Sequence, residues 1–484
     1  MPLYMRIKSD IVNKITSGEL KKGDKLPPER TLAKTFGVSR ITIVGALSEL
    51  EREGIIKKIH GSGSYIDCNY LKDDYSDIFT HITSNAKTKI SFGIFNPDPQ
   101  YEYVIKTLAK VFQLENPDIE VSVVNIKPAS SSADDSYLLK IGSGEAPTVG
   151  EFFLHSDYAA INGLIPLENL PGFKELTESI HPQCYYTTRN ASGEEHIHAL
   201  ASKINTRVVL ANVDMLKQAG INKTETLPDM DTLLEWVEAL GQYSKRQNRE
   251  YYGCHLEIPE GWHGIISNFP YLWGNNINID NHSFKAYIDF IKSSTCHHGF
   301  TKMAQFYKLG NPTPRNGVDL FALGRVGISL TSSTWPIILN NQMIQKFNLK
   351  SYLIPSNDPG IPARSVMGGY YLGIFRSAVK TEAELGAAWK WIKFLFRKQQ
   401  QHLQTSDYTF PAVKNIPNIL FDLYPDISTI FEKSISNSTP QFDFRNVRKA
   451  LIITGDEFKQ CVVDKKPTKQ CIDDILELLE KIHR

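Results

Sequence analysis

The sequence predicts a multidomain protein in which a small unit of three helices and a hairpin precedes a long α/β body. Its 484 residues are about three times the length of a typical single domain, so two or three domains are expected. A hydrophobic content of 41% with 22% charged residues is the balance of a globular chain rather than of a disordered one. In the body, apolar periodicity alternates between that of strands and that of helices, which is the pattern of an α/β fold.

Several classes of protein are excluded by what the sequence lacks. No run reaches the roughly 18 to 20 apolar residues that a membrane helix needs, so no membrane partner is expected. The first ten residues have neither an apolar h-region nor a small-residue cleavage site, so we expect a cytoplasmic protein. The six cysteines are scattered, without a C-x-x-C pair or the spacing of a zinc site, which in a reducing compartment indicates free thiols.

Charge is divided unevenly along the chain, although the formal net charge is only +1. Residues 1–68 hold 12 Lys and Arg against 8 Asp and Glu, a balance of +4, and the remainder holds 42 against 45, a balance of −3. A basic head on a mildly acidic body favours contact between the head and a polyanion. A solvated surface can carry the same balance, so the local sequence must decide between the two.

The first 67 residues contain three apolar stripes with helical spacing, each followed by a glycine. Pro28 suits the first turn of the second helix, and Ser39 is typical of the N-cap of the third. The stripes consist of Tyr4, Ile7, Ile11 and Ile15, then Leu32, Ala33 and Phe36, and finally Ile43, Ala46, Leu47 and Leu50.

A hairpin is predicted after the third helix. Two short apolar pieces, Ile55–Ile56 and Tyr65–Ile66, flank the basic, glycine-rich segment Lys57–Ser64. Three helices followed by a hairpin form a winged helix-turn-helix.

The head contains a series of different short motifs at fixed spacings. They are Gly18–Leu20, Gly23–Arg30, Leu32–Ala33, Phe36–Arg40, Thr42, Ala46–Leu47, Leu50, Glu53–Gly54 and Gly61–Gly63. With these motifs the head resembles the GntR family of bacterial transcription regulators. In that family the third helix enters the major groove of DNA and the tip of the wing reaches the minor groove. The resemblance therefore implies double-stranded operator DNA as a partner.

The resemblance also implies roles for individual residues. Arg30 and Arg40 would contact bases or nearby phosphates, because arginine pairs bidentately with guanine. Ser39 and Thr42 would contact the DNA backbone, and Lys57 is expected to contact phosphates. The wing tip, which would approach the minor groove, comprises His60, Gly61, Ser62 and Gly63.

Alternatives remain open for these residues. Arg30 and Arg40 could be surface charges or ion-pair partners of Glu29 and Glu49, and the glycines of the tip could serve only a hairpin turn. The head also departs from the family in one place, because Val44 stands where a basic residue is usual. Valine can touch a thymine methyl group but cannot pair bidentately with guanine, so the operator need not follow the family's usual pattern.

Residues 68–88 are polar and have no periodic apolar stripe. We interpret them as a linker between the winged helix of residues 1–67 and the body of residues 89–484. The body opens with a strand, a helix and a strand, and similar alternation recurs along it. The strands are expected at Lys89–Phe95, Glu120–Ile126, Thr148–Leu154 and Val326–Leu330, and the helices at Tyr101–Asn116, Tyr137–Ile141 and Met230–Leu240.

The body contains a second set of motifs. Through their order and spacing over nearly its whole length, the body resembles the family 1 extracellular solute-binding proteins. The segments are Lys89–Val124, Ser143–Val149, Ala160–Leu167, Leu200–Ile221, Phe321–Ile328, Thr334–Trp335, Gly368–Ile374 and Ala388–Leu395. The resemblance implies a type II, periplasmic-binding-protein-like fold with two lobes joined by crossing strands. The ligand would lie between the lobes and would be a sugar or oligosaccharide.

Sugar recognition needs flat aromatic faces against C–H patches and planar polar groups for the hydroxyls. The resemblance places candidates of both kinds on the cleft walls. They are Phe95, Asn96, Ser156, Asp157, Tyr158, Asn205, Thr206 and Arg207, and from the other lobe Trp262, Trp273, Trp335, Gly369, Tyr370 and Tyr371. For Trp262 and Trp273 a packing role is an equal alternative, and Trp389 and Trp391 belong to a helix stripe in the core or at the surface.

No pattern in the chain demands catalysis or a metal. The consecutive residues Cys296, His297 and His298 are expected in a loop, and His196 and His198 have no third ligand nearby in the sequence. The common phosphate-loop, zincin and hydrolase signatures are absent, so neither a cofactor nor a catalytic residue is expected.

The sequence thus predicts a one-component transcription regulator that binds operator DNA as a homodimer and senses a small molecule, a carbohydrate by resemblance. Two alternatives remain at this point. One is a regulator whose body is an enzyme-like domain with pyridoxal phosphate, for which the necessary lysine motif is not found. The other is a carbohydrate-binding protein whose head no longer binds DNA.

Overall fold

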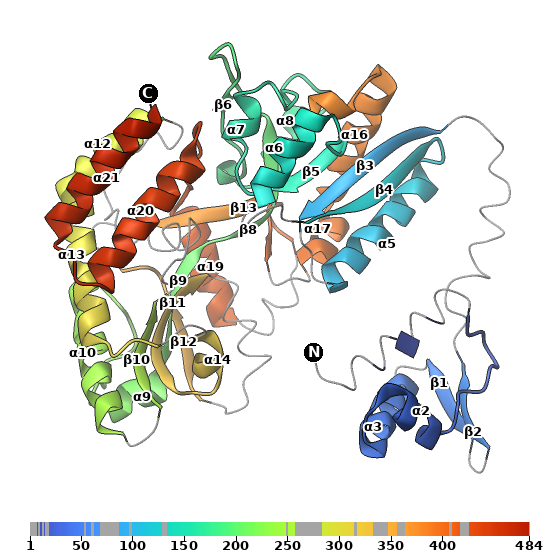
Figure 1. The fold of residues 1–484 in the computed structure, drawn as a ribbon, viewed down its shortest axis with the longest axis horizontal. Helices are drawn as coiled ribbons and strands as arrows, with labels where there is room; N and C mark the ends of the chain where they lie inside the picture. Colours follow the sequence, from blue (N-terminus) through green and yellow to red (C-terminus); the bar gives the residue numbers. More distant parts are fainter. Residues whose placement is uncertain are drawn as a thin grey trace. The chain divides into compact units, whose positions relative to one another are not determined.

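The computed structural model divides the chain into two compact units, residues 1–86 and residues 87–484 (Figure 1). The residues that it describes are 7, 10–11, 14, 19–52, 55–59, 62–67, 87–95, 99–127, 133–247, 250–256, 283–313, 317–332, 347–355, 364–405, 409–416 and 425–483.

The head has the predicted helices and hairpin. Its elements are α2 (Glu29–Phe36), α3 (Arg40–Arg52), β1 (Ile56–Ile59) and β2 (Gly63–Ile66). Helix α2 ends at Gly37, whose φ of 65° is the left-handed conformation that glycine adopts without strain. The Ser39 hydroxyl accepts the Thr42 N–H at 3.2 Å, which confirms Ser39 as the N-cap of α3. Strands β1 and β2 pair antiparallel, with Ile56 opposite Ile66.

The predicted apolar stripes form the core of the head. Ile43, Ala46, Leu47 and Leu50 of α3 are at most 1% exposed, so this helix buries one complete face. Ile7 and Ile11, the described apolar residues of the first stripe, are also buried and helical. Their partners Tyr4 and Ile15, together with Gly18, lie outside the described residues.

The body contains two sheets, and each organises one lobe. Lobe 1 has a seven-stranded sheet in the order β14-β8-β13-β5-β3-β4, with β15 paired to β13. Strand β3 runs parallel to β4 and β5, whereas β13 runs antiparallel to β5 and β8. The elements of lobe 1 are β3 (Thr88–Phe95), α5 (Pro99–Glu115), β4 (Ile119–Ile126), α6 (Ala133–Ser143), β5 (Val149–Phe152), α7 (Ser156–Ala159), α8 (Phe173–Ser179), β6 (Thr188–Arg189), β7 (Glu195–His196), β8 (Ala199–Asn205), β13 (Ser365–Ile374), α16 (Glu382–Leu395), α17 (Lys398–Gln404), β14 (Phe410–Pro411) and β15 (Ser438–Pro440).

Lobe 2 has a four-stranded sheet in the order β10-β11-β9-β12. Helix α19 (Pro425–Ser436) contacts β12 of this sheet and β13 of lobe 1. The other elements of lobe 2 are β9 (Arg207–Asn212), α9 (Val213–Gln218), α10 (Met230–Arg246), β10 (Tyr252–Leu256), α12 (Phe284–Lys292), α13 (Ser294–Leu309), α14 (Gly317–Ala322), β11 (Val326–Ser332), β12 (Leu349–Tyr352), α20 (Val447–Val462) and α21 (Thr468–His483).

Helices cover both faces of the lobe 1 sheet because its central strands are buried along nearly their whole length, with apolar side chains on both faces (Figure 1). On one face, Phe92 of β3 packs edge-on against Trp391 of α16 with ring centroids 5.6 Å apart. On the other face, Gly93 leaves room for Tyr137 of α6, whose hydroxyl donates to the Gly93 carbonyl at 3.1 Å. A Cβ at this glycine would lie 2.9 Å from that hydroxyl.

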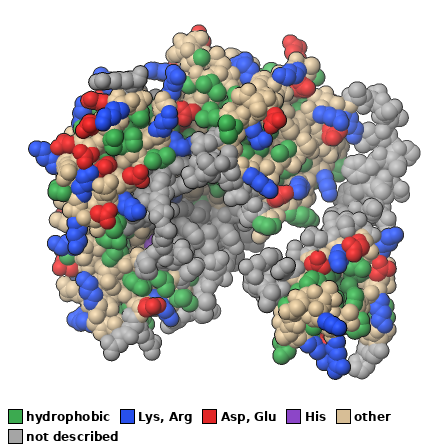
Figure 2. Space-filling model, viewed as in Figure 1, with side chains coloured by type: hydrophobic (Ala, Val, Ile, Leu, Met, Phe, Trp, Pro, Cys, Tyr) green, Lys and Arg blue, Asp and Glu red, His purple; other side chains and the backbone are tan. Residues whose placement is uncertain are grey.

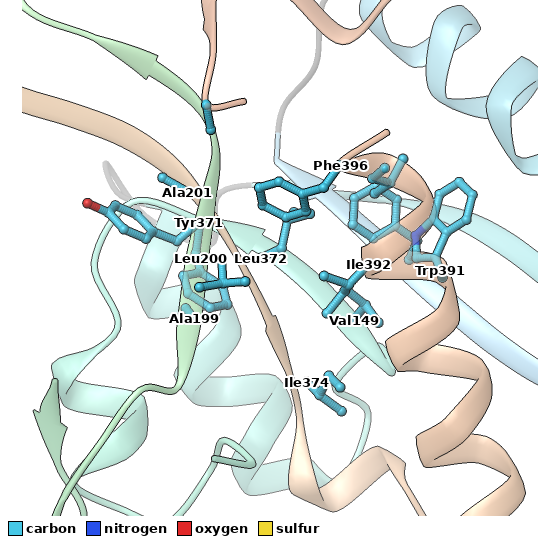
Figure 3. Packing of buried hydrophobic residues seen from close by; sticks show 14 of the residues in the cluster. Val149, Ala199, Leu200, Ala201, Tyr371, Leu372, Ile374, Trp391, Ile392 and Phe396 are labelled. Atoms are coloured by element: carbon cyan, nitrogen blue, oxygen red, sulfur yellow. The ribbon is translucent and has the colours of Figure 1, made fainter. Parts of the chain in front are cut away.

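The aromatic stripe of α16 belongs to the core. Trp389 and Trp391 are 2% and 0% exposed, which decides between the two alternatives for this helix. Figure 3 shows Trp391, Ile392 and Phe396 beside Leu372 of β13 and Val149 of β5.

The chain passes between the lobes more than once. Strand β8 of lobe 1 continues through Thr206 into β9 of lobe 2, and β12 of lobe 2 precedes β13 of lobe 1. A later passage leads from β15 in lobe 1 to α20 in lobe 2. The body therefore has the two-lobed architecture with crossing strands that the resemblance implied.

One local prediction is wrong. Cys296, His297 and His298 lie in helix α13 rather than in a loop, because the hydroxyl of Ser293 caps the helix at the Cys296 N–H. The predicted strands and helices of the body all occur, with boundaries shifted by a few residues.

Candidate DNA-binding and effector-binding sites

The head carries a groove of about 560 Å³ between α2, the start of α3 and the hairpin. Four residues predicted to bind DNA line it, namely Arg30, Arg40, Ser62 and Gly63. Lys25 and Lys58 also line this groove, against a single carboxylate, Glu29. Figure 2 shows Lys and Arg side chains gathered at the lower end of the head, whereas both signs of charge are mixed over the visible face of the body.

Arg40 forms an ion pair within the groove. Its Nε lies 2.9 Å from the Glu29 carboxylate, and its side chain remains 62% exposed. The ion pair with Glu29, one of the alternatives raised by the sequence, is thus present in the protein without DNA. An exposed pair of this kind contributes little to stability, so the guanidinium can exchange Glu29 for another anion at small cost.

Polar and apolar groups are both exposed at the start of α3. The hydroxyls of Ser39 and Thr42 lie 2.8 Å apart at the amino end of the helix. Val44 is 36% exposed, and Ile41, which sequence analysis did not select, is 84% exposed. Its only signal in the sequence is an isoleucine outside the buried stripe, directly after Arg40.

The wing is described in part. Lys57 is exposed and lies 3.5 Å from Asp67, and it does not line the groove. Its neighbour Lys58, which sequence analysis missed, points into the groove and donates to the Ser48 hydroxyl at 3.1 Å. His60 and Gly61 lie outside the described residues.

Lobes 1 and 2 enclose a second cavity of about 710 Å³, which we call the interlobe cavity. Lobe 1 contributes the start of α7 and the β6–β7 hairpin, and lobe 2 contributes the start of α12 and the segment before α20. The lining comprises Ser156, Ala160, Arg189, Asn190, Ala191, Gly193, Ser283, Phe284, Lys285, Phe444, Arg445, Asn446 and Ile482. Of the described residues predicted for the ligand site, only Ser156 belongs to this set.

Ser156 and Asp157 are held by the chain segment that leads into α20. The Asp443 carboxylate accepts the N–H groups of His155 and Ser156 at 2.9 and 3.1 Å and the Tyr186 hydroxyl at 2.7 Å. Burial raises the pKa of Asp443, while these donors oppose the shift. Asp157 in turn accepts the Asn446 N–H at 2.7 Å, and burial raises its pKa as well.

Half-buried aromatic residues follow the strand ends of lobe 1. Phe95 at the end of β3 packs on Phe153, and the Phe153 ring lies 4.6 Å from that of Tyr370. Beneath them Lys203 is buried, with its Nζ 3.1 Å from Glu151 and 4.1 Å from the centre of the Tyr370 ring. Phe95 and Tyr370, both predicted for the ligand site, are thus brought together on the carboxyl edge of the sheet. The expectation that Tyr370 and its neighbours Gly369 and Tyr371 come from the other lobe is wrong, because β13 lies in the same sheet as β3.

The remaining candidates fall into two groups. Asn205 and Arg207 flank the crossing from β8 to β9, where Arg207 donates to Asn205 at 3.4 Å. Other candidates are packing residues, because they are buried among protein groups. Thr206 bonds to Ser434, Tyr158 and Tyr371 lie in the aromatic core, and Gly369 lets β13 approach Ala201 of β8 closely.

These four residues are therefore poor candidates for ligand contact. Rings from distant segments contribute to the burial of the two tyrosines, Phe375 against Tyr158 and Tyr186 against Tyr371, and the local sequence does not specify them. Asn96, Trp262, Trp273 and Trp335 lie outside the described residues.

Comparison with known families assigns both units. Residues 3–66 match the bacterial regulatory proteins of the gntR family. Residues 107–420, more than half of the chain, match the bacterial extracellular solute-binding proteins. The chain belongs to the bacterial extracellular solute-binding protein family and carries a GntR winged helix at its N-terminus.

The relatives of the GntR winged helix are transcription regulators. The mannosyl-D-glycerate transport/metabolism system repressor MngR of Escherichia coli is 48% identical over 65 residues, 13% of this chain and 27% of that protein. The arabinose metabolism transcriptional repressor of Geobacillus stearothermophilus is 42% identical over 66 residues, 14% of this chain and 18% of that protein. The chain thus matches about a fifth to a quarter of the length of these curated relatives.

The solute-binding domain shares its fold with solved sugar-binding proteins. The substrate-binding protein Lmo0181 of Listeria monocytogenes, solved with cycloalternan, aligns with a TM-score of 0.65 and 16% identity over 82% of this chain and 99% of that one. The cyclic alpha-maltosyl-1,6-maltose binding protein of Arthrobacter globiformis aligns with a TM-score of 0.66 and 12% identity over the same shares. At such identities the likeness shows the fold alone.

Two structural features are absent from the described residues of both units, namely membrane-spanning helices and groups of metal ligands. No helix in the described part of the chain combines the length and apolar character needed to cross a membrane. Among the same residues, no three His, Cys, Asp or Glu side chains are grouped as metal ligands would be.

Proposed function

We propose that this protein is a cytoplasmic one-component transcription regulator that binds operator DNA through its winged helix and a carbohydrate through its two-lobed domain. The observation that carries the proposal is the joining, in one chain, of a cation-lined GntR head to a solute-binding domain with an interlobe cavity. A DNA-binding unit works on chromosomal DNA, so the attached lobes would report on a ligand inside the cell rather than feed a transporter.

The proposed DNA contacts follow the groove of the head. Arg30 and Arg40 would contact bases or phosphates, and Val44 with Ile41 would touch thymine methyl groups. The remaining contacts are those of Ser39, Thr42, Lys57, Lys58, His60, Gly61, Ser62 and Gly63 with the DNA backbone and the minor groove.

A carbohydrate is the favoured effector class. Several relatives support it, because the regulators repress arabinose metabolism or the transport and metabolism of mannosyl-D-glycerate, and the fold relatives bind oligosaccharides. In this chain Phe95 and Tyr370 offer aromatic faces, and Ser156, Asp157, Asn205 and Arg207 offer polar groups. Trp262, Trp273 and Trp335 remain candidates for stacking.

A homodimer on a palindromic operator completes the proposal. One winged helix reads only a half-site, so useful operator affinity requires two copies related by two-fold symmetry.

The proposal is tested by measuring both activities on the full chain. Selection of DNA fragments should recover a palindrome, and a thermal-shift screen against a carbohydrate panel should find a stabilising sugar. A ligand at 100 times its dissociation constant stabilises the folded state by about 2.7 kcal/mol. Failure to retain any DNA, with a sugar bound, would favour a carbohydrate-binding protein with an inactive head. An absorption band near roughly 420 nm in the purified protein would instead favour a pyridoxal phosphate domain.

A further inference from the structure

The interlobe cavity has an unusual charge for a sugar site. Three of its described lining residues are cationic, namely Arg189, Lys285 and Arg445, and none of the described lining residues is acidic. Resting on the proposed function, we infer that the effector is an anionic sugar whose phosphate ester or carboxylate binds to these three side chains.

The cations come from both lobes. Arg189 lies on the β6–β7 hairpin of lobe 1, whereas Lys285 lies in the first turn of α12 and Arg445 lies just before α20 in lobe 2. An anion between them would therefore attract both lobes at once. Such a ligand would bind more tightly to a closed arrangement of the lobes than to an open one. A ligand-driven switch requires this difference in affinity.

Two of the three charges have no acidic partner among the residues that the structure describes. Arg189 pairs with Glu195 at 3.1 Å. Lys285 and Arg445 are exposed, and within the described part of the chain neither has an acidic partner. A cation without a partner that borders a cavity can bind an anion without first breaking an ion pair.

The ends of two helices add to the positive potential. Helices α12 and α20 both begin at the cavity wall, and the amino end of a helix carries a partial positive charge. The neighbouring carboxylates are engaged within the protein, Asp157 by the Asn446 N–H and Glu194 by the Asn190 side-chain amide.

The rest of the wall suits the sugar part of such a ligand. The Asn446 side chain offers hydrogen bonds for hydroxyl groups, and the Ser156 hydroxyl, which donates to the Asp443 carbonyl, can still accept one. The half-buried Phe284 offers an aromatic face for C–H groups. Polar groups for the ring and cations for the charged end thus line one cavity.

The test compares sugars that differ only in charge. Calorimetry with the full chain would use hexoses that stabilise it in the thermal screen, each beside its 6-phosphate and its uronate. We expect the phosphate or uronate to bind at least about tenfold more tightly than the neutral sugar, because hydrogen bonds to a charged group are stronger than those to a neutral one. Its affinity should fall with added salt, and that of the neutral sugar should not.

Variants locate the effect in the cavity. Arg445→Gln and Lys285→Gln should each reduce the advantage of the anionic sugar roughly tenfold while leaving the neutral sugar unaffected. Lys292→Gln is the matched control, because Lys292 is exposed on the same helix as Lys285 but does not line the cavity. Inorganic phosphate should protect the native protein from thermal unfolding more than chloride at equal ionic strength, and Arg445→Gln should remove the difference.

The outcomes separate this inference from the proposed function. Equal or tighter binding of the neutral sugar, with no effect of Arg445→Gln, would overturn the anionic effector and leave the sugar sensor intact. Preference for the anion that survives both substitutions would overturn the assignment to this cavity. Absence of binding by every sugar, neutral or charged, would overturn the proposed function together with the inference.

Discussion

Arg40 forms the ion pair that its sequence position permits, and it remains a candidate for contact with DNA. In the protein without DNA its guanidinium pairs with Glu29 at 2.9 Å, and both side chains line the groove of the head. An exposed ion pair is worth roughly 0–1 kcal/mol, so a phosphate or a guanine can displace Glu29. The ion pair therefore holds Arg40 at the groove where DNA is expected to bind, and it is weak enough for DNA to displace Glu29.

We expect Arg40→Ala to cost roughly 1–3 kcal/mol of operator binding and to relax sequence specificity. Lys57→Ala should weaken operator and random DNA alike, because an exposed lysine on β1 can reach only phosphate. Fluorescence anisotropy with both DNAs would measure the two ratios. A loss at Arg40 that is equal for operator and random DNA would mean that this residue also contacts only phosphate.

His198 makes stability depend on pH. It is 1% exposed, and burial lowers its pKa to about 4, from an ordinary value near 6.5. Between these values the unfolded state binds a proton that the folded state does not, so the free energy of unfolding rises with pH across this window.

From pH 7 to pH 5 we expect His198 to account for a loss of about 2 kcal/mol in the free energy of unfolding. Denaturant titrations at both pH values give the loss in the free energy of unfolding for the wild type and for His198→Gln. The difference between these two losses is the contribution of His198. The glutamine can still reach the Thr188 hydroxyl, which bonds to His198 at 2.8 Å. Equal losses in the two proteins would show that His198 titrates normally.

At the scale of elements, the segment between β15 and α20 is bonded to lobe 1 at several points, and the Asp443 carboxylate makes the most buried of these bonds. Asp443 is fully buried and satisfies the N–H groups of the turn between β5 and α7, while its neighbours Phe442 and Phe444 pack in the core of lobe 2. Removal of this acceptor would leave buried donors without partners, which costs about 1–3 kcal/mol for each group.

Asp443→Ala should therefore lower the free energy of unfolding by at least about 3 kcal/mol, and Asp443→Asn by less, because the amide oxygen still accepts one or two bonds. Asp456→Ala, at an exposed position on α20, is the control and should change little. Urea titration would measure all three. A small effect of Asp443→Ala would mean that water replaces the carboxylate.

The hairpin of α20 and α21 holds two thiols in contact. A hydrogen bond from Cys471 lowers the pKa of Cys461, whereas burial raises the pKa of Cys184, Cys254 and Cys296. The thiolate is the reactive form, and Cys461 is 3% exposed whereas Cys184, Cys254 and Cys296 are 0% exposed. Among these four residues we therefore expect Cys461 to react first with a thiol reagent at neutral pH. In a Cys68→Ser background, peptide mapping after brief alkylation should find the label at Cys461, and Cys461→Ser should abolish the early reaction. Early label at Cys184 instead would contradict the burial of that residue.

At the scale of the whole molecule, the proposed function depends on coupling between two compact units, the head of residues 1–86 and the body of residues 87–484. A ligand can act on DNA binding only through a difference in its affinity for two arrangements of the lobes. The interlobe cavity, with walls from both lobes, is where such a difference would arise.

We expect the ligand to shift operator affinity by about 5- to 150-fold, the usual range of coupling between sites. By reciprocity, operator DNA must shift ligand affinity by the same factor. Titration of the ligand with and without operator measures the coupling directly. Identical ligand affinities would reject the allosteric link even if each site binds well alone.

The sequence by itself determined the two units, the elements within them and the family of each. This succeeded because helix caps, apolar periodicity and turn glycines act locally, as at Ser39, Gly37 and the stripe of α3. The tertiary structure decided which residues line a site. Tyr158 and Tyr371 were expected at a cleft but are buried, in part by rings from distant segments, and Arg189, Lys285 and Arg445 come together only where three separate segments meet. Burial and charge clustering depend on contacts between residues far apart in the chain, and a local pattern carries no record of them.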